Sequence, residues 1–542
     1  MQIPVDILHW SLSVLPILVL AFLLVQLRWT AQQAGALGIF VTALIALLVF
    51  RTPWETLSVA GAKGVWDAIF ILAVIWPALL LYQVMNRSGG YETMRQGITR
   101  MSRNELFIIV ALGWVFTSFL QGIDGFGTPI AIVAPLLVAF GVKPVYAVAI
   151  PIIAHIWAKF YGTLGAGWLA TLQVVGLDEA ATLDFAYQSA VLIVIQAVLG
   201  GFTVVWLYGR WAAVKHGWPL VVIIAAIQGF GQMAAVFIDP VLAAFLPATV
   251  ALVALFPLAR WRRYQEPAAG ITERPAMAAE ALTITEEKKP PMSTAMSFLP
   301  YVLLSIFAVG SSVIPWLGEL LRSWRIGLPF PEVSTGYGVV RDATEMYAPL
   351  SPLSHPGFGV LLIAVITWVL FAARGYFAAW HRETPQRGTL LGGLVRTAVP
   401  ASVPIVTFLV MAQMMNHSGQ NDALALGIAA VAPAYVYAFL ANGIGVIGAF
   451  TTSSSTSSNV LFSDMQVKMA ELKGLSVPTI LAAQSAGGAI GNAIAPANIV
   501  MGASTVGIIG KEGEIMRKTL PWTAAAFVLT GIATVIMVMV GA

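Results

Sequence analysis

The sequence predicts an all-α polytopic membrane protein with about 14–16 membrane segments, in two inverted-topology repeats with discontinuous helices or re-entrant hairpins. Three observations support this fold class. Of the 542 residues, 58% are hydrophobic and only 10% are charged, whereas soluble domains carry roughly 25% charged residues. Apolar runs long enough to cross about 30 Å of hydrocarbon recur along the whole chain. Polar, glycine-rich stretches interrupt some of these runs at matching places in the two halves.

The apolar runs predict the membrane spans in order. Candidate spans lie near residues 9–28, 34–50, 65–85, 105–120, 121–140, 145–175, 187–209, 219–237, 241–259, 297–317, 357–376, 396–415, 423–441, 442–465, 478–500 and 520–541. With this tally the basic loops at residues 87–103, 210–215 and 260–289 fall on one side, which the positive-inside rule assigns to the cytoplasm. Both termini would then face outward.

The composition excludes several classes of function. The chain has no cysteine, which excludes disulfides, thiolate metal sites and cysteine nucleophiles. The net charge of +4 is the ordinary bias of cytoplasmic loops, so we expect no nucleic-acid partner. The sequence contains no His-Glu-x-x-His and no Gly-x-Ser-x-Gly, so we expect neither an enzyme nor a bound cofactor.

The chain divides into two membrane halves. Residues 1–259 form the predicted N-terminal half and residues 297–542 the C-terminal half. The segment between them, residues 260–296, is mostly polar, proline-rich and aperiodic, which predicts a flexible cytoplasmic linker. A second long connection, residues 318–356, contains prolines and aromatic residues and is predicted to be a packed outer loop.

The two halves share a short repeated pattern. MNRSG at residues 85–89 and MNHSG at residues 415–419 each end a span, and each is followed by a span that closes in Phe-Leu and by a polar break. The shift from the third predicted span to the twelfth is nine, an odd number, which turns the second copy upside down. Inverted repeats with polar breaks near the middle of the membrane are typical of secondary transporters. The alternative is that a five-residue match arises by chance.

The first polar stretch, QGIDGFGTP at residues 121–129, places Asp124 among glycines at membrane depth. Lipid tolerates a broken helix only where protein buries the break or where it lines a wet cavity. A kinked helix packed through its glycines is the alternative explanation. However, a carboxylate at this depth is costly and is usually functional or paired. We therefore expect a function for Asp124.

The second polar stretch, HIWAKFYGTLG at residues 155–165, contains two nitrogen bases. His155 and Lys159 are four residues apart and so share one helical face. Two nitrogen donors on one face suit an anion, or a carboxylate proton carrier such as Asp124. The alternatives are that Lys159 extends to the cytoplasmic interface and that His155 is a hydrogen-bonded core residue.

Two further polar stretches lie in the second half. GAFTTSSSTSSN at residues 448–459 holds eight consecutive hydroxyl residues, which offer donors without net charge. In a soluble protein this run would be interpreted as a linker, but here it lies between apolar spans. QSAGGAIGNAIAPAN at residues 484–498 is rich in small residues, with glutamine and asparagine as its polar groups. Half-helix N-termini exposed by such breaks present free N–H groups that bind small anions.

Three motifs resemble the lactate permease family. They are GFGTP at 125–129 with APLL at 134–137, TSSNVLF at 456–462 followed by Gln466, and the long run from Gln484 to Glu514. The resemblance covers most of the chain. It implies a bacterial inner-membrane permease that takes up lactate, and in some members glycolate, together with protons. The expected partners are thus a small 2-hydroxy monocarboxylate, protons and the lipid bilayer, with a homo-oligomer left open.

The expected site combines the polar stretches near the middle of the bilayer. Helix-end N–H groups, the hydroxyl run and Lys159 would hold the substrate carboxylate. The side-chain amides of Asn459, Gln484 and Asn492 would form hydrogen bonds with the 2-hydroxyl of the substrate. The expected substrate-binding residues are Gln121, Gly125, Gly127, Thr128, Lys159, Thr452, Ser453, Ser454, Ser455, Thr456, Ser457, Ser458, Asn459, Gln484 and Asn492. Asp124 would carry the coupling proton, with His155 as the next group in the proton route; no metal ligand is expected. The alternatives are a sodium-coupled carrier of another organic anion and a passive anion channel.

Overall fold

The computed structural model describes residues 4, 6–27, 29–125, 127–278, 291–338, 340–385 and 388–541. Within these residues, eleven helices are long and apolar enough to cross a membrane, and two shorter apolar helices cover Thr128–Ala139 and Pro144–Ala154. The chain is therefore a mostly helical, multi-pass membrane protein, as the sequence predicts. The count of eleven long helices is lower than the predicted 14–16 segments for two reasons. One long helix contains two predicted spans, and several other predicted spans are broken into shorter helices.

The first half of the chain folds as helices α1 to α11. Their bounds are α1 (Ile7–Ala21), α2 (Ala31–Leu48), α3 (Trp54–Arg87), α4 (Gly90–Thr99), α5 (Glu105–Val110), α6 (Thr117–Ile123), α7 (Thr128–Ala139), α8 (Pro144–Ala154), α9 (Gly162–Val174), α10 (Glu179–Ala235) and α11 (Phe245–Ala259). Short π-helical segments cover Phe22–Gln26 and Ala111–Phe116, and 3-10 turns cover Ile156–Ala158, Pro240–Leu242 and Arg262–Tyr264.

The second half folds as helices α12 to α22 and two small antiparallel sheets. Their bounds are α12 (Thr294–Val313), α13 (Pro315–Arg322), β1 (Ile326–Phe330), β2 (Val333–Ser334), β3 (Val340–Arg341), β4 (Thr344–Leu350), α14 (Pro356–Ala373), α15 (Tyr376–Glu383), α16 (Leu390–Ser418), α17 (Gln420–Val431), α18 (Ala434–Thr452), α19 (Ser455–Lys473), α20 (Val477–Gly491), α21 (Pro496–Thr505) and α22 (Glu512–Val540). Strand β1 pairs with β4, and β2 pairs with β3.

Helix α10 is a hairpin of two packed arms. Its backbone leaves the helical region at Gly209 and Arg210, where φ is −151° and 55°. A Cβ atom added to Gly201 in the first arm would lie 2.9 Å from Val221 in the second arm. The arms are therefore antiparallel, and they correspond to the two spans predicted on either side of residue 210.

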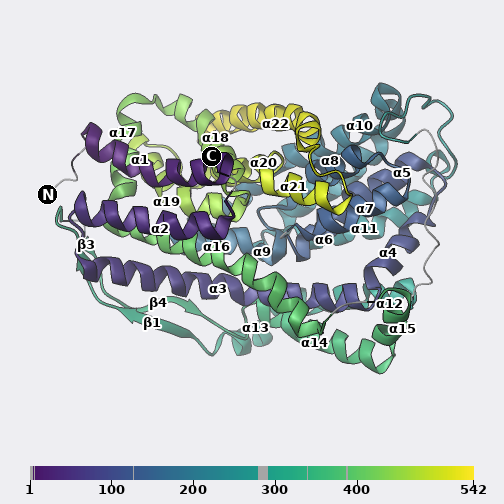
Figure 1. The fold of residues 1–542 in the computed structure, drawn as a ribbon, viewed down its shortest axis with the longest axis horizontal. Helices are drawn as coiled ribbons and strands as arrows, with labels where there is room; N and C mark the ends of the chain where they lie inside the picture. The colour runs from purple at the N-terminus through teal and green to yellow at the C-terminus, as the bar shows by residue number, and fades with distance from the viewer. Residues whose placement is uncertain are drawn as a thin grey trace.

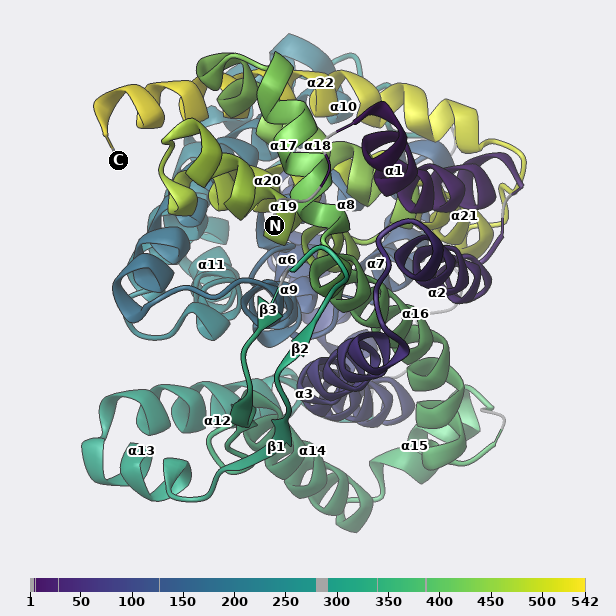
Figure 2. The same ribbon diagram turned by 90° about the vertical axis from the view of Figure 1, so that its left-hand side faces the viewer.

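Helices α3 and α16 form the long central pair of the fold. Gln83 near the end of α3 donates a hydrogen bond to Thr397 near the start of α16, at 3.4 Å. Gly64 near the start of α3 packs on the backbone of Val410 in the second half of α16. The two helices are therefore antiparallel. Figures 1 and 2 show α3 between the layer formed by α12–α15 and the rest of the molecule.

The apolar helices around this pair are staggered along α3. Helix α2 packs on α16 and faces the first half of α3 across one apolar groove, which is lined by residues of both helices, including Leu44 and Leu57. Helix α14 instead begins beside the middle of α3, where Gly357 packs on the carbonyl of Ala73. Both helices expose large apolar side chains, such as Phe40 on α2. The two lipid-facing surfaces therefore lie at different heights along α3.

The order of elements after α3 is repeated after α16. The two helices end before Gly89 and Gly419, and both glycines have left-handed φ, 75° and 86°. Each glycine is followed by a short helix (α4 or α17), an interrupted helix (α6–α7 or α18–α19), a second interrupted helix (α8–α9 or α20–α21) and a long helix (α10 or α22). This order supports the repeat inferred from MNRSG and MNHSG, whose inverted arrangement stays a prediction.

The basic loops predicted to share one side lie together at one end of the molecule. The backbone N–H of Arg103 donates to the carbonyl of Gln265, and Arg263 donates to the carbonyls of Lys215 and His216. Figure 1 shows α4, α5 and α15 at this end, opposite the N terminus and β3. Of the linker predicted at 260–296, residues 260–278 pack here, with Tyr264 fully buried, and residues 279–290 lie outside the described residues.

Candidate functional site

The ends of four interrupted helices meet around one polar cavity of about 160 Å³. The interruptions lie between α6 and α7, before α9, between α18 and α19, and between α20 and α21. The lining residues are Gln121, Gly125, Gly127, Lys159, Gly162, Thr163, Ser453, Ser454, Ser455, Thr456, Asn492 and Asn498. Nine of the fifteen predicted substrate-binding residues are in this set. The structure therefore brings polar residues of both halves into one place.

Lys159 supplies the positive charge of the cavity. Its side chain follows a 3-10 turn, and the residue is 7% exposed. Its Nζ donates to the carbonyl of Gly125 at 3.4 Å. Among the described lining residues there is no aspartate or glutamate. Lys159 is therefore a buried residue of the cavity lining and does not extend to a surface.

Asp124 is a buried carboxylate close enough to this lysine to interact with it electrostatically. It ends α6 with an extended backbone, and the next described residue that lines the cavity is its neighbour Gly125. One carboxylate oxygen accepts a hydrogen bond from the Thr128 hydroxyl at 2.7 Å, and the carboxylate interacts electrostatically with Lys159. The residue is 2% exposed. Asp124 is thus a buried counter-charge of Lys159 and does not itself line the cavity.

Thr163 connects the two interruptions of the first half. Its hydroxyl oxygen accepts a hydrogen bond from the Gly125 N–H at 2.8 Å. Thr163, Leu164 and Gly165 all have left-handed backbones, with φ of 53°, 49° and 75°. Non-glycine residues adopt this region at a cost of roughly 1–2 kcal/mol each. The surrounding structure must therefore hold this segment in place.

Ser453 connects the two interruptions of the second half. It has a φ of 56°, its hydroxyl accepts from the Ala497 N–H at 3.2 Å, and its carbonyl accepts from the Asn492 amide at 3.4 Å. The Asn498 amide donates to the Asn492 side chain at 2.6 Å. These bonds join the break between α18 and α19 to the break between α20 and α21.

The N-terminus of α19 points its first residues at the cavity. Ser454 caps this helix by accepting a hydrogen bond from the Ser457 N–H at 3.1 Å, and Ser455 and Thr456 follow in the first turn. The first-turn N–H groups of a helix have no partner within the helix, and they carry its positive dipole end. This end of the cavity therefore adds hydroxyl and N–H donors to the charge of Lys159.

The other predicted substrate-binding residues lie behind the cavity wall. Thr128 is bonded to Asp124, and the Thr452 and Ser458 hydroxyls donate to the carbonyls of Gly448 and Gly445. Gln484 donates to Ser458, and Asn459 donates to Ser485. Ser457 contributes its backbone N–H to the α19 cap. The bonds of Ser458, Asn459 and Gln484 join α18, α19 and α20, whereas those of the other three residues are local, so all six belong to the wall and not to the lining.

His155 is also separate from the cavity lining. It is 1% exposed, and its Nδ1 contacts the carbonyl of Pro151 one turn earlier. Its Nε2 has no hydrogen-bond partner among the described residues. Among the described residues, Lys159 is the charged group that acts on the imidazole. Lys159 thus interacts with both His155 and Asp124, and the place of His155 after Asp124 in the proton route stays a prediction.

Three lining residues were absent from the predicted set: Gly162, Thr163 and Asn498. Each belongs to a stretch that the sequence singled out. The signal for the first two was the glycine-flanked break after Lys159, and the signal for Asn498 was its place two residues after Pro496, where a helix can restart.

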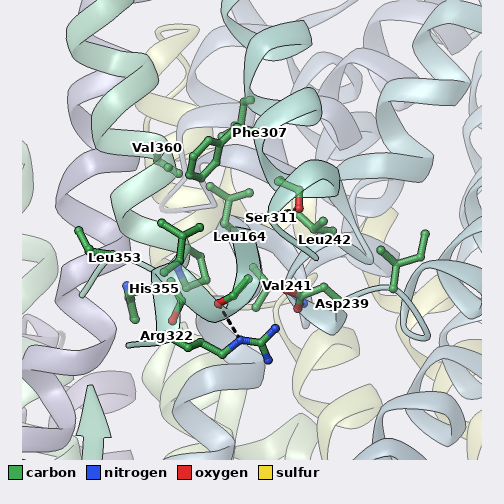
Figure 3. Close-up of a pocket in the computed structure, with 18 residues that line it drawn as sticks. Leu164, Asp239, Val241, Leu242, Phe307, Ser311, Arg322, Leu353, His355 and Val360 are labelled. Atoms are coloured by element: carbon green, nitrogen blue, oxygen red, sulfur yellow. Dashed lines mark hydrogen bonds between the residues drawn. The ribbon is translucent and has the colours of Figure 1, made fainter. Parts of the chain in front are cut away.

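A larger cavity of about 380 Å³ lies on the other side of the left-handed segment (Figure 3). Thr163 lines the smaller cavity and Leu164 lines the larger one, together with Asp239 and Arg322. Arg322 donates to the carbonyl of Gly318 at 3.1 Å. Burial raises the pKa of the Asp239 carboxyl above its ordinary value, whereas the bond from the Val241 N–H and the charge of Arg322 lower it. The two cavities are thus separated by the Thr163–Gly165 backbone.

Comparisons with known proteins cover nearly the whole chain. The sequence model described as L-lactate permease matches residues 10–541. The chain is 26% identical over 550 residues to the L-lactate permease of Salmonella typhimurium, covering 97% of this chain and 95% of that one. It is also 26% identical over 555 residues to the glycolate permease GlcA of Escherichia coli, with the same coverage.

A solved structure is similar at a lower level. The YdaH transporter of Alcanivorax borkumensis is 14% identical, with a TM-score of 0.42, covering 87% of this chain and 85% of that one. The family match spans the membrane helices and all four helix interruptions. The chain is therefore a multi-pass transporter and not an enzyme, and it belongs to the L-lactate permease family.

Proposed function

We propose that this protein imports lactate or glycolate across a bacterial inner membrane together with protons. The relatives named above are permeases for these two acids. The observation that carries the proposal is that Lys159 lines the small cavity and interacts electrostatically with the Asp124 carboxylate, which is buried outside the lining. Lys159 can bind the substrate anion, and Asp124 can bind the proton.

The cavity suits a small hydroxy acid in size and chemistry. Its volume of about 160 Å³ is below the roughly 300–1,000 Å³ of pockets for drug-sized ligands. Lys159 would bind the substrate carboxylate, with N–H and hydroxyl donors from Ser455 and Thr456 at the α19 N-terminus. The Asn492 and Asn498 amides and Gln121 offer both donors and acceptors to the 2-hydroxyl. Asn459 and Gln484, the other two amides predicted from the sequence, lie in the cavity wall and would support the site from there.

The Lys159–Asp124 pair couples substrate and proton binding by competition. A bound substrate carboxylate shares the charge of Lys159 with Asp124. The buried Asp124 carboxylate then loses part of its compensation, and an uncompensated buried charge takes up a proton to become neutral. Substrate and proton therefore bind together, and each stabilises the binding of the other. His155, which interacts with Lys159, is the next base along this route.

The proposed orientation follows the basic residues. The end of the molecule that holds Arg103, Arg263 and Lys215 would face the cytoplasm, and both termini would face outward. Import is then movement from the β-strand end toward the arginine-rich end.

The test is uptake of labelled lactate by proteoliposomes that contain the Asp124→Asn variant. With one proton carried per lactate, a pH gradient of one unit supports about tenfold accumulation, because each factor of ten in concentration corresponds to 1.4 kcal/mol. We expect the variant to lose this accumulation and to keep exchange of internal for external lactate at equal pH. Glu383→Gln, which removes an exposed carboxylate from α15, is the control. Full accumulation by Asp124→Asn would show that Asp124 is not the coupling group.

A further inference from the structure

A second group of buried ionisable residues lies away from the substrate cavity. Lys63 and Asp67 are one turn apart on α3, and Gln413 and His417 are one turn apart on the antiparallel helix α16. Lys63, Asp67 and His417 are 5%, 0% and 4% exposed. Strands β1 and β4 cover them, and the Lys63 Nζ lies 5.0 Å from the ring centre of Tyr347. None of these residues lines the cavity.

The hydrogen bonds fix the protonation pattern of His417. Its Nδ1 lies 2.9 Å from the carbonyl oxygen of Gln413. A carbonyl oxygen only accepts hydrogen bonds, so Nδ1 carries a hydrogen. In a neutral imidazole the other nitrogen, Nε2, is then an acceptor. The Nζ of Lys63 lies 3.3 Å from this Nε2 and donates to it.

In this arrangement the Lys63 Nζ and the His417 Nε2 share one dissociable proton. If both Lys63 and His417 were charged, an ammonium and an imidazolium would face each other at 3.3 Å in a buried place, which is strongly unfavourable. The proton can move by breaking one N–H bond of Lys63 and forming an N–H bond on Nε2 of His417. The positive charge then moves from the ammonium to the imidazolium, and the net charge of the pair is unchanged.

Asp67 is the counter-charge of this pair. One of its oxygens accepts from the Gln413 amide at 2.7 Å and from the Tyr347 hydroxyl at 3.2 Å. Its other oxygen, Oδ1, has no hydrogen-bond partner among the described residues. An unpartnered buried carboxylate oxygen is costly in a purely structural network. Such an oxygen is available to accept a proton from the same cluster.

The remaining charges that act on the pair come from β3 and α19. Arg341 on β3 donates to the carbonyl of Asn416 at 2.8 Å and repels positive charge on Lys63 and His417. Asp464 on α19 attracts positive charge on His417, and this carboxylate is itself bound by Lys468 at 3.0 Å and by the Asn421 amide at 2.7 Å. Helix α19 begins at the substrate cavity, so it connects the cluster to the cavity.

We propose that Lys63 and His417, with Asp67 beside them, form a second proton-binding site, which holds one proton and passes it on during transport. This inference rests on the proposed function, because it assigns a second station to the same coupled proton. The proton enters from the end of the molecule where the β-strands lie. The site is separate from Asp124, so its removal should uncouple transport without removing the substrate site.

The decisive variant is Lys63→Arg. Arginine keeps the positive charge and donates to His417, but its guanidinium does not release a proton in proteins. We expect Lys63→Arg to retain lactate exchange at equal pH and to lose the accumulation of about tenfold that a pH gradient of one unit supports. Accumulation equal to that of the parent would overturn the proposal, because it would show that only a fixed charge is needed at this position.

A second variant guards against a local packing defect caused by the larger side chain. His417→Gln removes the imidazole while keeping a polar group, and it should give the same result as Lys63→Arg. Lys215→Met, which removes a lysine from the arginine-rich end, is the control and should behave as the parent. Loss of exchange in both variants would also overturn the proposal, since a proton-binding role predicts that exchange is retained. Failure of the parent itself to exchange lactate would instead contradict the proposed substrate.

Discussion

Thr163 and Ser453 line the same cavity from opposite halves of the chain, and both have left-handed backbones, with φ of 53° and 56°. In each case the hydroxyl of the strained residue accepts a backbone N–H from a neighbouring interruption, Gly125 for Thr163 and Ala497 for Ser453. Strained backbone that is held by its surroundings is common at ligand-binding sites. Two residues that shape the cavity, Thr163 and Ser453, therefore have strained backbones.

The first prediction concerns this strain at Ser453. Ser453→Gly removes the steric cost of a left-handed backbone, whereas Ser453→Ala keeps it, and both lose the hydroxyl. We expect the glycine variant to be more stable than the alanine variant by about 1 kcal/mol. The order of apparent melting temperatures in detergent checks this expectation.

Ser463 provides the matched control for Ser453. It lies in the middle of α19, is fully buried, and has a regular helical backbone. Here the order should reverse, because glycine in a helix is about 1 kcal/mol less favourable than alanine. The same order at both positions would contradict the account of strain.

The second prediction concerns the charge of Lys159. Lys159→Gln removes the ammonium from the cavity while keeping a polar side chain. A hydrogen bond to a charged group contributes about 1.5–3 kcal/mol, so the apparent KM for lactate should rise by about 10- to 100-fold. Initial uptake rates across a range of lactate concentrations measure this. Lys143→Gln, which changes an exposed lysine, should leave the KM unchanged; an unchanged KM in Lys159→Gln would make Lys159 a structural residue.

The third prediction concerns the coupling ion. The described lining of the cavity contains a lysine and no carboxylate, so it repels Na⁺, which prefers oxygen ligands with negative charge. Replacing sodium by choline at a fixed pH gradient should therefore leave the rate of lactate uptake unchanged. A rate that follows the sodium concentration would favour the alternative carrier, in which the hydroxyl run coordinates the cation.

The fourth prediction concerns the close packing of α18 against α20. A Cβ at Gly487 would lie 1.9 Å from the carbonyl oxygen of Asn442, and one at Gly513 would meet no atom within 4 Å. Gly487→Ala should destabilise the protein by about 1–3 kcal/mol or more through overpacking. Gly513→Ala in α22 should stabilise it slightly through helix propensity. Thermal unfolding of both variants measures the two shifts, and a mild effect at Gly487 would mean that α18 and α20 separate easily.

The sequence was sufficient for the fold class because lipid imposes simple rules. Apolar length and glycine-rich breaks identified the spans and the interruptions, since unbonded backbone within a membrane must be buried or wet. The strands β1–β4 were missed because they are short and carry no alternating apolar pattern that distinguishes them from a packed loop.

The candidate site was predictable by region but not by residue. Of the hydroxyl run from Thr451 to Ser458, only Ser453 to Thr456 line the cavity. A helix turns about 100° per residue, so once α19 begins, Ser457 and Ser458 turn toward other helices. The pairing of Lys63 with His417 could not be predicted from the sequence either, because it depends on the antiparallel register of α3 and α16. In the sequence, His417 stood out only as part of the MNHSG copy of the repeat.

The staggering of α2 and α14 along α3 has a consequence for the surrounding lipid. The 34 residues of α3 extend over about 51 Å, whereas the hydrocarbon layer is about 30 Å thick. The two exposed apolar surfaces fit one bilayer only if α3 tilts or if the membrane bends or thins along one side of the protein. Any movement that shifts one surface relative to the other changes the free energy of that deformation. Acyl-chain length should therefore alter the transport rate even where every residue of the cavity is unchanged.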